Sequence, residues 1–355
     1  AVCSIEGRQE SLQSMMTRLD QCQKSLNEYL DQKKKIFPRF YFVSNVALLD
    51  MLANGTNPIK IIKYIGDCYD SLSGLTFCVI DGKQHAKLVN EMIAKDGERL
   101  MLHEDFLLEG EIERYLNNLT EAMRVTLKYK MQEGYNSAAG WESGGELGPR
   151  HEWLFSFPAQ AVVTNTQIYW TEECEASLED LSGGQEDAVK RYLQTLENRL
   201  QELINKVLGE LESGDRVKVI TIITLDVHGR DVVQRLVDEK VDGHEAFLWQ
   251  QQLRFYWVPS SLDTEIRICD FRTRYFYEWI GNTGRLVITP LTDRCYVTLT
   301  MGLRLFLGGA PAGPAGTGKT ETTKDLARAL ALPCYVFNCS DQMNYQTMAD
   351  IFRGL

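Results

Sequence analysis

Apolar residues recur every three or four positions along several stretches of the chain, the spacing that one face of an α-helix produces. The clearest stretch is 186–212, and its apolar positions are Leu193, Leu196, Leu200, Leu203, Val207 and Leu211. Stretches 10–31 and 111–132 show the same spacing, and 47–52 fits a short helix, so we expect the first 135 residues to be largely helical. The 186–212 helix is too short for a sustained heptad repeat, which favours packing in a bundle over a coiled coil.

Other stretches predict loops or leave the type of element open. The apolar run 217–227 is typical of a strand, although a buried helix of this length fits equally well. Residues 134–150 contain five glycines and a proline, which predicts a loop. Aromatic residues are dense in 253–288, which indicates core or an interface.

A glycine-rich octapeptide matches the pattern G-x-x-x-x-G-K-[ST]. Its residues are Gly313, Pro314, Ala315, Gly316, Thr317, Gly318, Lys319 and Thr320. Glycines let successive backbone N–H groups turn toward one phosphate group, and the N-terminus of a following helix attracts the same anion. In this pattern the lysine contacts the β- and γ-phosphates, and the hydroxyl of Thr320 binds Mg²⁺. The octapeptide therefore predicts a site for ATP or ADP with Mg²⁺.

The sequence on either side of the octapeptide supports this interpretation. A phosphate-binding loop of this kind joins a strand to a helix. Before it, 303–307 is short and apolar; after it, 319–332 has helical spacing, and 334–337 is apolar again. We therefore expect a strand, the loop, a helix and a second strand, in that order.

Two other patterns suggest chemistry, and neither is favoured. Residues 181–185 spell the LSGGQ signature of ABC transporter ATPases, but they precede the octapeptide instead of following it. A turn leading into the 186–212 helix, with Ser182 or a glycine near the cap, explains them better. Asp226 and His228 would share one face of a strand, yet no nucleophile motif accompanies them, so a structural role is favoured. The five histidines form no metal-binding pair, and we expect no structural metal.

Charge and composition narrow the class of function. The formal net charge of −11 argues against a general nucleic-acid-binding protein, and no apolar run is long enough for a membrane helix. The nine cysteines include no C-x-x-C pair, which favours a reduced, cytosolic compartment over a disulfide framework. The sequence starts without Met and stops directly after a helical pattern, so we expect it to be part of a longer protein.

Beyond the octapeptide, the sequence resembles dynein heavy chains over nearly its whole length. The likeness to the start of the first AAA+ module of that family lies in 286–296, 308–313, the octapeptide, 321–326 and 336–341. Residues 37–45, 157–160 and 226–233 resemble the dynein linker. Within the family, 310–312 and 321–324 are similar to the axonemal branch, and 340–343 leans toward an outer-arm chain.

The resemblance implies a fold that is mainly α. Residues 1–284 would be the C-terminal part of the linker, a helical-bundle lever with a minor β element. Residues 285–355 would be a truncated α/β P-loop AAA+ module. The resemblance also places Val287, Ile288, Pro290 and Leu291 where the family encloses adenine. It places no catalytic residue within the sequence, because the acidic Walker B strand follows later in the family, so we expect this segment alone to be inactive.

The function that the resemblance implies is that of an ATP-driven microtubule motor of the ciliary or flagellar axoneme, in which ATP hydrolysis drives a swing of the linker. The implied partners are microtubules, contacted through other parts of the chain, further dynein heavy, intermediate and light chains, and the remaining AAA+ modules. Two alternatives stay open: a non-motor AAA+ or P-loop regulatory module, and a cytoplasmic dynein heavy chain. The turn-like residues 281–284 are either a joint between lever and ring or an ordinary connector.

Overall fold

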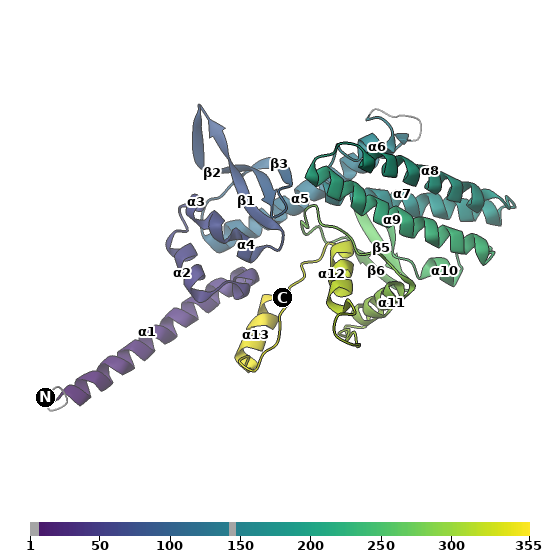
Figure 1. The fold of residues 1–355 in the computed structure, drawn as a ribbon. Helices are drawn as coiled ribbons and strands as arrows, with labels where there is room; N and C mark the ends of the chain where they lie inside the picture. Colours follow the sequence, from purple (N-terminus) through teal and green to yellow (C-terminus); the bar gives the residue numbers. More distant parts are fainter. Residues whose placement is uncertain (1–6, 142–146) are drawn as a thin grey trace.

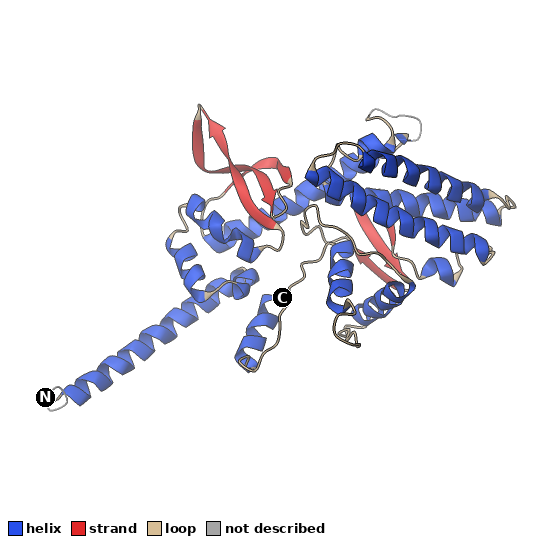
Figure 2. Cartoon of the chain, viewed as in Figure 1, coloured by secondary structure: helices blue, strands red, loops and turns tan. Residues whose placement is uncertain are grey.

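The structure is a computed structural model that describes residues 7–141 and 147–355 (Figure 1). Helices dominate the chain, and two three-stranded antiparallel sheets lie among them (Figure 2). The expectation of a mainly α chain with a minor β element is confirmed.

The N-terminal region begins with the helices α1 (Arg8–Ile36), η1 (Pro38–Phe42, a 3-10 helix), α2 (Asn45–Ala53), α3 (Pro58–Ile61), η2 (Ile62–Tyr64, also 3-10) and α4 (Ile65–Cys68). The helices predicted at 10–31 and 47–52 are both confirmed. Helix α1 extends away from the rest of the molecule, and its apolar residues Leu12 and Leu19 are more than half exposed (Figure 1). Only the C-terminal end of α1, around the buried Leu30, packs against the body.

Residues 72–107 form a sheet, so the helical expectation for this part of the chain is wrong. Strands β1 (Leu72–Ile80), β2 (Lys83–Ala94) and β3 (Arg99–Leu107) lie side by side in that order. Asp81 and Gly82, with φ of 51° and 73°, make the tight turn between the first two strands, and Asp-Gly is a strong hairpin signal. Met92 pairs with both Leu75 and Leu100, and all three side chains are buried. Cross-strand burial of one face therefore decides the structure here.

The middle of the chain is helical, with α5 (Ile112–Ala138), α6 (Arg150–Trp153), α7 (Ala159–Ser182), α8 (Ala188–Leu208), α9 (Ser213–Asp238) and α10 (Phe247–Gln250). Helices α7, α8 and α9 pack on one another as a bundle (Figure 1). The helices predicted at 111–132 and 186–212 are confirmed, as is the preference for a bundle. The interior of this bundle includes Leu178, Leu196 and Val233.

The apolar run 217–227 lies within α9, so the strand is wrong and the helical alternative is right. Val219, Ile222 and Leu225 are buried at helical spacing, because α7 and α8 cover one side of α9. The predicted loop at 134–150 begins later than expected, since α5 continues to Ala138. Part of that loop, 142–146, lies outside the described residues.

The second sheet joins the bundle to the C-terminal region. Its strands are β4 (Arg254–Val258), β5 (Asp263–Ile268) and β6 (Phe271–Arg274), in that order. Phe255, Tyr275 and Trp279, all from the aromatic stretch, are buried in the main core, which agrees with the core interpretation. The chain then continues through α11 (Pro290–Arg304), α12 (Lys319–Leu330) and α13 (Tyr345–Gly354).

Neither strand predicted beside the octapeptide is formed. The segment 303–307 completes α11 and then turns, and Phe306 is almost fully exposed with a φ of 56°. The segment 334–337 is not part of a sheet, and the Tyr335 ring stacks on that of Phe42 instead. A strand needs a neighbour for its hydrogen bonds, and in the described ranges no strand runs beside either segment.

No helix in 7–141 or 147–355 is long and apolar enough to cross a membrane. The cysteines of the same ranges are all free. Residues 7–141 and 147–355 also contain no cluster of His, Cys, Asp or Glu side chains that could hold a metal ion.

Candidate nucleotide-binding site

The octapeptide 313–320 forms an exposed loop that leads directly into helix α12. Gly316 and Gly318 both have a φ of +78°, a left-handed conformation that glycine adopts without strain. Gly318 caps the helix, which begins at Lys319. The first N–H groups of a helix have no partner within it and point toward its N-terminal side. The predicted residues therefore lie together, in the arrangement that binds an anion.

The side chain of Lys319 bends back over this loop. Its Nζ donates hydrogen bonds to the carbonyl oxygens of Gly313, at 2.9 Å, and Pro314, and it lies 3.4 Å from the hydroxyl of Thr317. All these contacts are exposed, so the ammonium can exchange carbonyl oxygens for phosphate oxygens without a buried charge being left behind. The positive end of the α12 dipole adds to the attraction.

Thr320 is the second residue of α12, and its side chain is exposed. Thr322 and Thr323 donate their hydroxyl hydrogens to backbone carbonyls four residues earlier in the chain. Within the described residues, the hydroxyl of Thr320 has no such partner. An oxygen of this kind beside a phosphate site is a suitable ligand for Mg²⁺. The residues present thus fit a nucleotide with its metal ion.

The four candidates for the adenine site lie just before α11 and in its first turn. Pro290 begins the helix, while Val287 and Leu291 are each 66% exposed. Ile288 differs from them, because its side chain packs against the main core. Val287 and Leu291 thus offer exposed apolar surface, and Ile288 anchors the segment that carries them.

A buried ion pair connects the segment before α11 to the phosphate-loop helix. Asp325 of α12 accepts two hydrogen bonds from the guanidinium of Arg285, both at 3.0 Å, and one from the backbone N–H of Leu286 at 2.9 Å. The hydroxyl of Tyr296 in α11 donates a further bond to the same carboxylate. We call Arg285, Tyr296 and Asp325 the clamp.

The clamp is deeply buried, with side-chain exposures of 4% for Arg285 and 1% for Asp325. Burial alone would raise the pKa of Asp325, but the Arg285 charge and the hydrogen bonds lower it overall. The carboxylate is therefore held in its charged form. Sequence reasoning missed the clamp, because its partners are 40 positions apart and match no motif.

The opposite end of α12 is attached to residues 275–280, which we call the strap. The backbone N–H groups of Phe276 and Glu278 donate to the carbonyl oxygens of Leu330 (3.1 Å) and Ala331 (3.0 Å). The strap follows β6 and forms neither helix nor strand; within it, Tyr277 has a φ of +58°. Helix α12 is thus fixed at its middle by the clamp and at its C-terminal end by the strap. No sequence signal predicts this second attachment.

The two disfavoured patterns have structural roles. Asp226 forms a bidentate ion pair with Arg150, at 2.7 and 2.9 Å. Two positions along a helix point in different directions, so His228 does not share the face of Asp226. Burial lowers the pKa of His228 to about 4. The LSGGQ residues 181–185 form the end of α7 and the turn toward α8, as expected.

The sequence matches two family models, and both concern dynein. Residues 1–134 match the model described as dynein heavy chain, N-terminal region 2. Residues 275–355 match the model described as the hydrolytic ATP binding site of the dynein motor region. The second match contains the strap, the clamp and the whole octapeptide.

Similar proteins include the β chain of the flagellar outer-arm dynein of Chlamydomonas reinhardtii, which is 44% identical over 353 residues, or 99% of this chain. Dynein axonemal heavy chain 17 of Homo sapiens is 43% identical over 352 residues, also 99% of this chain. The ciliary dynein β chain of Tripneustes gratilla is 44% identical over 346 residues, or 98%. The chain spans only 8% of the length of each of these relatives. Matched by both models and aligned over almost its whole length with axonemal heavy chains, the chain belongs to the dynein heavy-chain family.

Proposed function

We propose that this chain is part of the heavy chain of an axonemal microtubule motor, in which ATP binding and hydrolysis at loop 313–320 move the linker. One observation carries the proposal: the loop opens α12 with Lys319 and Thr320 at its start, in a chain whose relatives are flagellar and ciliary dynein heavy chains. The ciliary or flagellar axoneme is the location that follows from this. Microtubules and further dynein chains would be contacted by other parts of the heavy chain, because the present chain spans only 8% of the length of its relatives.

Within this proposal each site residue has a defined task. Backbone N–H groups of the loop and of the first turn of α12 bind the phosphates. Lys319 neutralises charge on the β- and γ-phosphates, and Thr320 holds the Mg²⁺. Val287 and Leu291 contribute apolar surface to the adenine, and the metal ion supplies charge stabilisation to phosphoryl transfer.

We further propose that residues 1–284 act as the lever and 285–355 as the start of the nucleotide-binding module. The division is supported by the clamp, which ties Arg285 to α12, inside the second unit. The strap, in the first unit, is bonded to α12 as well. The two units therefore share a contact in addition to the covalent connection.

The test is Lys319→Ala in the full-length heavy chain, with Lys324→Ala as the matched control. Lys324 lies in the same helix, is half-buried and pairs with the exposed Glu321 at 2.9 Å, so its loss should matter little. Hydrogen bonds to charged groups contribute about 1.5–3 kcal/mol, so Lys319→Ala should weaken ATP binding by roughly ten- to a hundredfold. Microtubule gliding should stop. Gliding at the wild-type velocity by this variant would count against loop 313–320 as the site that drives the motor.

A further inference from the structure

We infer that the strap transmits movement of α12 to the rest of the linker, and that Gln160 is the positioning residue that fastens the strap to the α7–α9 bundle. The inference rests on the proposed function, because it concerns how one nucleotide site moves the lever. It depends on contacts along both sides of residues 275–280.

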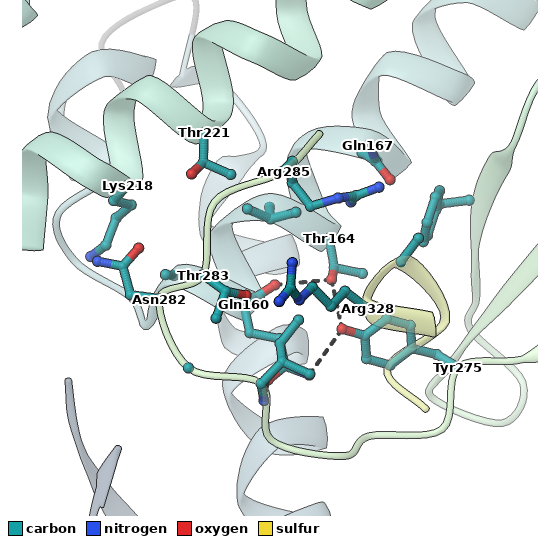
Figure 3. A pocket seen from close by; sticks show the side chains of 16 residues that line it. Gln160, Thr164, Gln167, Lys218, Thr221, Tyr275, Asn282, Thr283, Arg285 and Arg328 are labelled. Carbon is teal, nitrogen blue, oxygen red and sulfur yellow. Dashed lines mark hydrogen bonds between the residues drawn. The ribbon is translucent and has the colours of Figure 1, made fainter. Parts of the chain in front are cut away.

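The first side of the strap is bonded by one buried amide. Gln160, in the first turn of α7, donates through Nε2 to the carbonyl oxygen of Glu278 (2.8 Å) and to the hydroxyl of Tyr275 (2.9 Å). Its Oε1 accepts from the backbone N–H of Ile280 at 3.1 Å. Figure 3 shows Gln160 and Tyr275 pointing toward each other, with Thr164 beside them. A single side chain, 2% exposed, thus bonds both ends of the strap to α7.

The second side of the strap is bonded to α12. The N–H groups of Phe276 and Glu278 reach the last carbonyls of that helix. The strap is therefore held between the phosphate-loop helix and the bundle. Phosphate binding would replace the loop carbonyls at Lys319 and could shift α12. The strap must then move with α12, or its hydrogen bonds to the end of that helix break. In the same way α7 must move with the strap, or the hydrogen bonds of Gln160 break.

A buried ion pair attaches the strap to the N-terminal part of the linker as well. Arg39 of η1 donates two hydrogen bonds to the carboxylate of Glu278, both at 2.7 Å. The two side chains are 12% and 6% exposed, and the guanidinium also lies 4.7 Å from the ring centre of Tyr69. Breaking such a pair leaves an uncompensated buried charge, so the strap and η1 are expected to move together.

The contacts also locate the point where the connection can bend. Asn282 is still bonded to the linker, through Asp96 (2.7 Å) and Gly214 (2.7 Å), and Arg285 is already held by the clamp. Between them, in the part of the chain that the structure describes, Thr283 and Gly284 make no hydrogen bond. Of the two interpretations of 281–284, a joint or an ordinary connector, the joint would bend at these two residues.

The strap runs beside a small cavity that provides a control. The cavity, about 20 Å³ in volume, lies between α7, α9 and α12 (Figure 3) and has room for one water molecule. Gln167, two turns after Gln160 on α7, lines it, and among the described residues its Oε1 has no hydrogen-bond partner. Gln167→Leu removes an amide of the same size from the same cavity without touching the strap.

The experiment compares Gln160→Leu with Gln167→Leu in the full-length heavy chain. Basal ATPase rate, microtubule gliding velocity and thermal unfolding are measured for each. Unpairing the strap from α7 should lower the gliding velocity of Gln160→Leu by about tenfold, while its basal ATPase rate stays at the wild-type level. Gln160→Glu should be intermediate, because its carboxylate still accepts from the N–H of Ile280 but can no longer donate to the Tyr275 hydroxyl or to the carbonyl oxygen of Glu278.

Two results would overturn the inference. One is Gln160→Leu gliding as fast as Gln167→Leu. The other is a Gln160→Leu variant that loses ATPase and gliding in equal measure, because the residue would then act on folding or on the nucleotide site. Failure of the proposed function has a different signature: a wild-type heavy chain that neither hydrolyses ATP nor moves microtubules.

Discussion

Replacing Asp325 with asparagine tests whether the buried clamp holds the phosphate-loop helix in position. The substitution keeps the size of the side chain and removes its charge. Arg285 would then remain buried, with a side chain 4% exposed, beside a neutral amide that cannot accept its bidentate pair together with the bonds from Leu286 and Tyr296.

The size of the effect follows from this burial. Removing one partner of a buried ion pair costs about 3–5 kcal/mol. Asp270, which pairs with Arg304 at 2.9 Å but is 85% exposed, provides the control, since exposed pairs contribute about 0–1 kcal/mol. Asp325→Asn should therefore destabilise the 355-residue chain several times more than Asp270→Asn.

Urea unfolding followed by fluorescence gives the global difference, and hydrogen exchange of the α12 amides locates it. A loss of about 3 kcal/mol corresponds to roughly a hundredfold faster exchange through the affected opening. Equal unfolding midpoints and equal α12 exchange for the two variants would refute the reasoning, because the clamp would then contribute no more than a surface pair.

The pH dependence provides a second readout for the clamp. The pKa of Asp325 is lowered in the folded chain, so its contribution is fully present above the unfolded-state pKa of about 3.9. This contribution is lost as the pH falls through the lower folded-state pKa. Asp325→Asn should lack this part of the acid sensitivity, and a pH profile parallel to that of the wild type would contradict the assignment.

Further predictions concern the isolated chain and the bundle. The purified 355-residue chain should bind Mg-ATP without hydrolysing it at a useful rate, and ATPase activity abolished by Lys319→Ala would contradict this. Because burial lowers the pKa of His228 to about 4, the wild type should lose stability as the pH falls from about 6.5 toward that value, whereas His228→Gln should not; melting temperatures measured across this range test it. A Cβ at Gly229 would lie 2.7 Å from Nε1 of Trp170, so Gly229→Ala should destabilise the bundle by about 1–3 kcal/mol. Gly214→Ala, near the start of the same helix and without a close contact, should be neutral or stabilising in the same unfolding assay.

Local features of the chain could be predicted from the sequence. The loop 313–320 is specified by its own glycines, and the 186–212 helix is specified by an apolar stripe that only a helix can bury on one side. The hairpin at Asp81 and Gly82 also has a local signal, but the helical spacing in 10–31 and 111–132 on either side of it dominates the prediction for the N-terminal part. For 217–227 no local signal exists, because α7 and α8 determine which side of that run is covered.

Contacts between distant segments could not be predicted. Arg39 and Glu278 are 239 positions apart, and nothing in the residues around either of them identifies the other. The same holds for Gln160. In the sequence it is only a polar residue near the start of a helix, and its hydrogen bonds to the strap become evident in the structure. The strands expected next to the loop depend on neighbouring strands for their hydrogen bonds, and a pattern of apolar residues carries no information about whether such neighbours are present.

The two helices that the strap connects, α12 and α7, differ in length and would act as lever arms of different length. Helix α12 has 12 residues and α7 has 24, which corresponds to arms of about 18 and 36 Å. The strap joins the C-terminal end of the short arm to the N-terminal end of the long one. If both arms turn through the same angle, the far tip of α7 travels about twice as far as the end of α12, so a small tilt at the phosphates becomes a larger displacement at the far end of the bundle.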